Sequence, residues 1–269
     1  MAGCAQPKET PSVGSMFNAP PVDVNRNSRL WLTGPWALCR QLASAAMWAL
    51  APPRCLLCEA AGDAGAIDIC HHCLAQLPRT GSAWQPGMGA IARICCPWRY
   101  DYPVDALIRS LKFRGERACG RLLGGLLAEQ LRGDEGSHAT VVVPMPLHQR
   151  RLQQRGYNQA TEIAMFAARP LALPVRRDVL ARQRATLAQS TLSLAERRLN
   201  PRGAFKAGEQ LRGAHVALVD DVITTGSTAA AAAEALLAAG VASVELWVLA
   251  RVQRAAASHT MPSNTAMPK

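Results

Sequence analysis

The sequence predicts an α/β protein with a mainly parallel β-sheet flanked by helices, preceded by a small cysteine-rich module. Residues 215–219 form an apolar run, residues 228–239 are strong helix formers closed by Gly240, and residues 241–249 are apolar again. Strand, helix and strand in this order make the parallel crossover unit of α/β folds. From residue 91 onward strand-like and helix-like runs alternate, whereas two close cysteine pairs lie before that point.

The two ends of the chain are expected to contribute little to the core. Residues 1–29 are polar with few large apolar side chains, which is typical of a disordered segment, and the Ala/Ser/Pro-rich tail at 253–269 has the same character. Residues 36–50 carry apolar side chains at helical spacing and precede two prolines, so we expect a helix there. The expected division is a disordered segment (1–29), a region with the helix, the cysteine module and a Gly/Pro-containing linker (30–89), a main domain (90–252) and the tail (253–269).

Between these ends the hydrophobic pattern predicts the remaining elements. Strands are expected over residues 91–100, 140–143 and 175–180. Helices are expected over residues 101–112, 117–131 and 148–168, the first with Asp101 as its cap and Pro103 in its first turn. Ser193 and Glu196 have the spacing of a capping box, which predicts a short helix.

Charge is unevenly distributed along the 269 residues. The net charge is +11, and residues 146–213 contain thirteen Lys or Arg and four Asp or Glu, a net charge of +9. This concentration predicts a polyanionic partner, either the phosphates of a small molecule or a nucleic-acid backbone, with a plain solvated surface as the alternative. Neither an uninterrupted apolar run of about 18 residues nor a secretory signal is found, so we expect no membrane span and a cytoplasmic protein.

Four cysteines form two pairs, Cys55–Cys58 and Cys70–Cys73, separated by eleven residues. Each CxxC pair directs two thiolates at one centre, and tetrahedral Zn²⁺ needs four such ligands. Disulfides are rare in cytosolic proteins, and reduced structural cysteines are the alternative. We expect one structural zinc ion in a zinc-ribbon-like module, because four thiolates leave no open position for water. His71 and His72 lie inside the second pair and could compete as ligands, but neither sits at the repeated spacing.

The most informative stretch is 216–228, Val-Ala-Leu-Val-Asp-Asp-Val-Ile-Thr-Thr-Gly-Ser-Thr. An apolar strand brings Asp220 and Asp221 to the carboxyl edge of the sheet, where open α/β sheets bind ligands. Residues 224–228 then present successive backbone N–H groups, hydroxyl side chains and the positive end of a helix, which suits a phosphate monoester. Two carboxylates beside such a nest predict a ligand with hydroxyls or a metal ion, such as a ribose 5-phosphate. The alternative is an ordinary strand–turn–helix with an Asp-rich cap.

This stretch resembles the motif of type I phosphoribosyltransferases that binds 5-phosphoribosyl 1-pyrophosphate (PRPP). Residues 107–115, 143–160 and 182–205 resemble further hallmarks of the ComF family of ComFC- and GntX-like proteins. With the four cysteines, the resemblance runs from about residue 52 to residue 251. It implies a type I phosphoribosyltransferase-like domain with a mainly parallel sheet, preceded by a zinc module.

The resemblance also implies roles for particular residues. Asp220 and Asp221 would contact the ribose hydroxyls as the catalytic pair, and the 5-phosphate would be held by Thr224, Thr225, Gly226, Ser227 and Thr228. Mg²⁺ would accompany PRPP and neutralise the leaving pyrophosphate. Our candidates for pyrophosphate contacts are Lys112, Arg150, Arg151 and Arg155, with plain surface cations as the alternative. Tyr157 and Asn158 could line an acceptor pocket, although packing is an equal alternative for Tyr157.

Two functions stay open on the sequence. The first is a phosphoribosyltransferase with an unknown acceptor, since no residue identifies the nucleophile. The second is a non-catalytic nucleic-acid-binding accessory protein, because the ComF family is associated with DNA uptake and DNA use in bacteria. Its partners would be single-stranded DNA or proteins of the uptake machinery, although Arg clusters without interleaved aromatic residues are weak evidence for single-strand binding.

Overall fold

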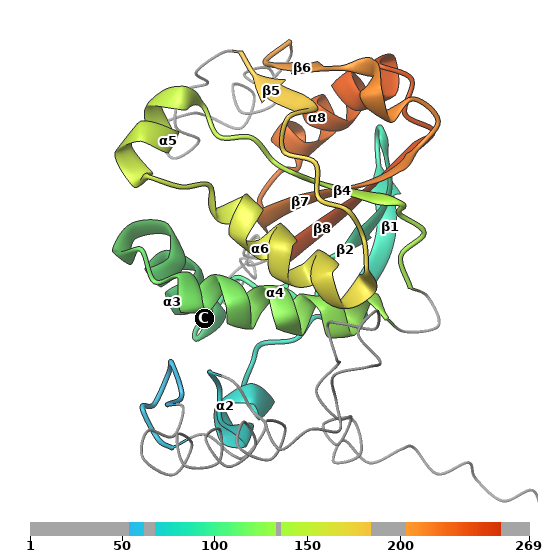
Figure 1. Cartoon of the computed structure of the whole chain (residues 1–269). Helices are drawn as coiled ribbons and strands as arrows, with labels where there is room; N and C mark the ends of the chain where they lie inside the picture. Colours follow the sequence, from blue (N-terminus) through green and yellow to red (C-terminus); the bar gives the residue numbers. More distant parts are fainter. Residues whose placement is uncertain (1–53, 62–67, 133–135, 184–202, 254–269) are drawn as a thin grey trace, which may run out of the picture.

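The computed structural model describes residues 54–61, 68–132, 136–183 and 203–253 (Figure 1). The helix expected at 36–50, the short helix expected at 193–196 and the two terminal segments expected to be disordered lie outside these residues. Across the described ranges, no helix combines the length and the apolar character needed to cross a membrane.

Within the described residues, six strands form the main sheet in the order β1–β2–β8–β7–β4, with β3 also paired to β8. Of the pairings among them, only β1 with β2 is antiparallel. The mainly parallel α/β sheet is therefore confirmed. The strands are β1 (Trp84–Met88), β2 (Ile91–Cys95), β3 (Trp98–Arg99), β4 (Val141–Pro144), β7 (His215–Ile223) and β8 (Ser243–Arg251).

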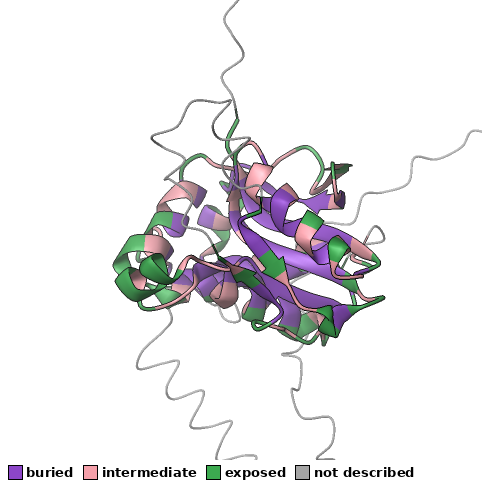
Figure 2. Ribbon diagram, turned by 90° about the horizontal axis from the view of Figure 1, so that it is seen from above, coloured by how far each residue is buried: buried purple, intermediate pink, exposed green. Residues whose placement is uncertain are grey.

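Helices cover both faces of this sheet, which is why most side chains of its central strands β7 and β8 are apolar and buried (Figures 1 and 2). Ala217 of β7 and Trp247 of β8 face the core shared with α4 (Arg117–Leu131) and α6 (Gln159–Ala168). Their neighbours Leu218 and Leu246 face the opposite core, under α8 (Ser227–Ala238). A separate antiparallel pair, β5 (Leu180–Arg182) and β6 (Phe205–Ala207), lies beside α8.

Several expected elements are shorter or divided in the structure. The strand expected at 91–100 is split into β2 and β3 around Pro97, which lacks a backbone donor for the ladder. The helix expected at 148–168 is two helices, α5 (Gln149–Arg155) and α6, because Gly156 adopts a left-handed φ of 78° and Asn158 caps the second helix. The strand expected at 175–180 is wrong in position: Val175 makes only a single bridge to Val142, and β5 begins at Leu180.

The helix expected at 101–112 begins later than the capping pattern indicated. Pro103 is its N-cap, Asp101 pairs instead with Arg99 (Nε–Oδ2 3.2 Å), and the regular part is α3 (Val104–Arg109). A π-helical turn, η2 (Ser110–Arg114), follows and ends at Gly115, whose φ is 73°. The stretch expected as a linker also contains structure, because β1 lies within it and pairs with β2.

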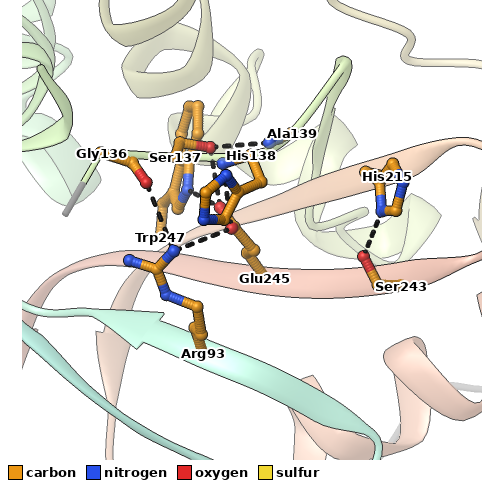
Figure 3. Close-up of polar contacts among 9 residues, drawn as sticks. All are labelled: Arg93, Gly136, Ser137, His138, Ala139, His215, Ser243, Glu245 and Trp247. Atoms are coloured by element: carbon orange, nitrogen blue, oxygen red, sulfur yellow. Dashed lines mark hydrogen bonds and ion pairs between the residues drawn. The ribbon is translucent and has the colours of Figure 1, made fainter. Parts of the chain in front are cut away.

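A buried carboxylate at the start of β8 holds the segment before β4 in place (Figure 3). Glu245 is 3% exposed and accepts hydrogen bonds from the Ser137 hydroxyl (2.7 Å), the His138 backbone N–H (3.1 Å) and the Trp247 indole N–H (3.3 Å). The Arg93 guanidinium lies 3.8 Å away. Because its partners come from several elements, this network is structural, and it lies near the amino end of β8.

Candidate active site

Asp220 and Asp221 lie toward the carboxyl end of β7 and line one cavity of about 390 Å³. Asp221 is 4% exposed, and its backbone N–H donates a 2.9 Å hydrogen bond to Oδ1 of Asp220. Two successive residues of a strand normally face opposite sides of the sheet. Both acids nevertheless line the same cavity at this edge of the sheet.

The two acids differ in their electrostatic surroundings. The ammonium nitrogen of Lys112, from η2, lies 2.9 Å from Oδ2 of Asp221 and compensates its charge. Burial, together with the negative charge of Asp221, raises the pKa of Asp220 to about 7, while Lys112 and Arg182 act in the opposite direction. Asp220 therefore titrates near neutral pH, and a ligand that brings a cation or hydroxyl donors would favour its ionised form.

The turn that follows β7 leads directly into α8. Gly226 is the N-cap of α8 and has a φ of 77°, in the left-handed region that favours glycine. Thr224, Gly226 and Thr228 line the cavity beside the acids, whereas Thr225 and Ser227 line a second, smaller hollow next to Met88. The positive end of an α-helix and the acid pair thus border one cavity.

Cationic side chains form another part of the cavity wall. Of the four candidates for pyrophosphate contacts, Lys112, Arg151 and Arg155 line the cavity, whereas Arg150 is exposed on α5 and is not among the lining residues. Arg182 of β5 also lines it, with its guanidinium 5.4 Å from the centre of the Phe205 ring. Burial and the nearby charge of Arg151 lower the pKa of Arg182.

The lining residues that the sequence did not indicate as site residues include Arg182 and Phe113. Phe113 lies within one stretch that resembles the ComF family, and Arg182 begins another. The resemblance therefore included both residues but did not indicate what they do. Tyr157 and Asn158, considered for an acceptor pocket, do not line the cavity. The Tyr157 hydroxyl donates to the carbonyl of Leu111, and the Asn158 amide donates to the carbonyl of Met145 at 2.9 Å. They hold the walls of the cavity in place.

The four cysteines of the CxxC pairs converge on one point. Their Sγ atoms all lie within 4.8 Å of one another, and those of Cys58 and Cys70 are 3.6 Å apart. Tetrahedral zinc with Zn–S bonds of about 2.3 Å separates its sulfur ligands by about 3.8 Å, so this group could hold a zinc ion. His71 and His72 are not part of the group, and His72 Nε2 instead lies 2.8 Å from the side-chain nitrogen of Gln76.

The cysteine module is joined to the main domain on the side of α4 away from the sheet (Figure 1). Cys55, Cys73 and α2 (His71–Ala75) border the same core as α4. Asp68, which is 8% exposed, accepts two hydrogen bonds from the guanidinium of Arg121, at 2.7 and 2.9 Å. A bidentate pair of this kind fixes both distance and orientation.

Comparison with known proteins agrees with this geometry. Residues 154–265 match the model of the phosphoribosyl transferase domain. The chain is 33% identical over 222 residues to DNA utilization protein YhgH of Escherichia coli (strain K12), covering 74% of this chain and 97% of that protein. It is 32% identical over 189 residues to competence protein F of Haemophilus influenzae, covering 68% of this chain and 78% of that protein. It is 27% identical over 207 residues to competence protein ComFC of Bacillus subtilis, covering 68% of this chain and 84% of that protein.

Proposed function

The chain belongs to the ComF family, whose members include DNA utilization protein YhgH and competence protein F, and from this premise we propose that it binds Mg²⁺–PRPP and transfers its phosphoribosyl group. The observation that carries the proposal is the shared cavity. It combines the Asp220–Asp221 pair, the turn at the start of α8 and several cations. Each chemical part of PRPP therefore has a complementary group.

In this proposal the 5-phosphate binds the turn Thr224–Thr228, and the ribose hydroxyls contact Asp220 and Asp221. The pyrophosphate lies against Lys112, Arg151 and Arg155, joined by Arg182, because guanidinium groups match phosphate oxygens in pairs. Arg150, which does not line the cavity, keeps this role only as the weakest candidate. Mg²⁺ bound with PRPP supplies charge neutralisation for the leaving group.

The transfer itself replaces one bond at C1 of the ribose. The C1–O bond to pyrophosphate breaks, pyrophosphate leaves with the electron pair, and the developing oxocarbenium character is relieved when the acceptor bonds to C1. Asp220 and Asp221 would hold the ring while this happens, and the cations stabilise the negative charge that develops on the leaving oxygen.

We also propose that the cysteine group holds one structural zinc ion through Cys55, Cys58, Cys70 and Cys73. The spacing of the sulfur atoms fits tetrahedral thiolate ligation. Four thiolates would fill the coordination sphere, so the ion would stabilise the module and would not take part in the transfer.

The names of the relatives connect this family with DNA, and we propose that the chain acts in DNA uptake or utilisation. One observation favours the alternative function, a non-catalytic accessory protein that binds single-stranded DNA. All residues of α5 are described, and none of their side chains is buried. The helix carries three arginines, Arg150, Arg151 and Arg155, which we call the α5 arginines. An exposed helix with three guanidinium groups suits a phosphate backbone.

Calorimetry with PRPP, with and without Mg²⁺, tests the main proposal. We expect binding that Mg²⁺ strengthens, and pyrophosphate release once the correct acceptor is added. If the protein does not bind Mg²⁺–PRPP at millimolar concentration, the proposed site is wrong. DNA affinity that depends steeply on salt and does not respond to PRPP would favour the accessory function instead.

A further inference from the structure

The turn that leads into α8 is only weakly restrained by its own residues. Gly226, the N-cap, has no side chain that could accept a hydrogen bond from the first N–H groups of the helix, and glycine has the greatest backbone freedom of any residue. The Ser227 N–H donates a long hydrogen bond of 3.5 Å to Oγ1 of Thr225. A turn that must present its N–H groups in one arrangement therefore needs support from another part of the molecule.

Met88, at the end of β1, supplies a contact of this kind. A Cβ atom added to Gly226 would lie 2.5 Å from the sulfur of Met88 and 2.9 Å from its terminal methyl group, so this side chain fills the space beside the glycine. Met88 also lines the small hollow next to the turn, together with Thr225 and Ser227, whose hydroxyl oxygens are 3.0 Å apart. It does not line the larger cavity with the acid pair. Met88 therefore contacts the turn but is not placed to touch a ligand in that cavity.

The position of Met88 is fixed by the main sheet, at whose edge β1 lies (Figure 1). Met88 and Ile91 are partners in the register of β1 and β2, with Gly89 and Ala90 in the turn between them. β2 pairs in turn with β8, and Ile91 is 2% exposed in the core under α8. Because the hairpin is anchored both in the sheet and in the core, it holds the flexible Met88 side chain against the turn.

We propose that Met88 is a positioning residue for the 5-phosphate, and that the β1–β2 hairpin is therefore part of the phosphoribosyl site. This inference rests on the proposed function, since it takes the turn Thr224–Thr228 to bind the 5-phosphate. The hairpin lies outside residues 154–265, which match the phosphoribosyl transferase domain. With Met88 in place the turn keeps the conformation that binds phosphate, so binding energy is not used to order it.

Calorimetry with ribose 5-phosphate and with Mg²⁺–PRPP tests this role of Met88. Met88→Ala should weaken both ligands by the same factor, about five- to tenfold, as expected if the turn is in its binding conformation for about 10–20% of the time. The factor is shared because both ligands use the turn through their 5-phosphate. Met88→Leu should keep nearly wild-type affinities, since leucine fills a similar volume. If Met88→Ala does not fold, Met88→Val replaces it with the same expectation, because valine suits a strand and lacks the far end of the side chain.

Ile91→Val is the matched control, because Ile91 belongs to the same hairpin and is buried but lines neither the cavity nor the hollow beside the turn. The loss of one methyl group should lower the stability of the hairpin and leave both affinities unchanged. Urea unfolding measures the stability of each variant, so that every affinity is compared on folded protein.

The inference is overturned if ribose 5-phosphate binds Met88→Ala as tightly as the wild type, or if Met88→Leu loses as much affinity as Met88→Ala. It is also overturned if Ile91→Val weakens binding to the same extent, since the cause would then be general loosening of the hairpin. A loss confined to Mg²⁺–PRPP would contradict it too, because the effect would lie at the pyrophosphate and not at the turn. If ribose 5-phosphate does not bind the wild type, the proposed assignment of the turn fails, and the inference fails with it.

Discussion

The ammonium nitrogen of Lys112 lies 2.9 Å from a carboxylate oxygen of Asp221, and both side chains are largely removed from water. This ion pair joins η2, which carries Phe113, to the central strand β7. Loss of one partner of a buried pair leaves the other charge uncompensated in a medium that solvates it poorly. The pair therefore contributes to the shape of the site and also to the stability of the fold.

Replacement of Lys112 by Met should lower the free energy of unfolding by about 3 kcal/mol, because Asp221 keeps its buried position without a cation. Urea denaturation measures this change. Arg212→Met is the control: Arg212 pairs with Glu209 at 3.0 Å, but both side chains are more than two-thirds exposed, so its loss should change stability little. Equal effects of the two substitutions would contradict a buried role for the Lys112–Asp221 pair.

Asp220 should make stability depend on pH between about 4 and 7. Its pKa is raised to about 7 in the fold by burial and by Asp221, whereas an unperturbed Asp has a pKa of about 3.9. In this window the folded protein binds the additional proton, so this contribution to stability is complete at low pH and is lost as the pH rises through 7. The wild type should lose up to about 4 kcal/mol relative to Asp220→Asn, at about 1.4 kcal/mol per pKa unit.

Urea unfolding of the wild type and of Asp220→Asn at a series of pH values measures this difference directly. Subtraction of the two curves removes the groups that titrate independently of Asp220. Parallel curves would show that Asp220 has an ordinary pKa in the fold.

The unit made by β7, α8 and β8 could be predicted from the sequence because its signals are local. The apolar runs are continuous, Gly226 and Gly240 mark the two ends of the helix, and Asp220 and Asp221 stand at the strand's end. The cysteine cluster could also be predicted from a local signal, because the CxxC spacing itself directs two thiolates at one centre.

The errors fall where a distant partner decides the structure. β1 has little strand character of its own and is ordered by its pairing with β2, and β5 depends on β6, which lies more than twenty residues further on. The breaks at Pro97 and Gly156 have local causes, because proline lacks a backbone donor for the sheet and glycine readily adopts the left-handed φ that ends a helix. Arg182 and Phe113 gain their roles only through the cavity, which forms when segments far apart in the sequence meet, so no local pattern could assign them.

Purified protein should contain close to one zinc ion per chain when no zinc is added. Metal analysis measures the ratio, and Cys70→Ser should lower it because three thiolates remain. Cys119→Ala serves as the control, since Cys119 is a buried cysteine outside the cluster and its loss should leave the zinc content unchanged. Folded protein without metal would rule out the zinc proposal.

If the chain binds DNA, the α5 arginines should contribute to it. Their replacement by Ala should weaken binding and reduce the slope of log affinity against log salt by up to about three units, roughly one for each lost phosphate contact. The control removes the same charge from the same basic segment at residues that do not line the cavity, Arg176, Arg177 and Arg212. An unchanged slope in the α5 variant, or an equal change in both, would place the DNA contacts elsewhere.

PRPP binding itself can be divided between the acid pair and the turn. Asp220→Asn and Asp221→Asn keep side-chain size and an acceptor oxygen but remove a negative charge. They should weaken Mg²⁺–PRPP by tenfold or more, about 1.4 kcal/mol, while inorganic phosphate, which needs only the turn, should be affected less. Calorimetry with both ligands measures the two effects, and equal losses for both ligands would contradict separate roles for the acids and the turn.

Gly226→Val should act differently and abolish the binding of both ligands. The φ of 77° at this position is unfavourable for a β-branched residue, so the turn has to change its shape, and the end of the Met88 side chain, whose sulfur would lie 2.5 Å from the added Cβ atom, has to move away. Gly240→Ala is the matched control, because Gly240 also has a left-handed φ, of 92°, but follows the other end of α8 and does not line the cavity. It should cost stability to a comparable extent and leave both affinities unchanged. If Gly240→Ala abolished binding as well, the loss in Gly226→Val would reflect general destabilisation, and the assignment of the phosphate to this turn would have no support from the experiment.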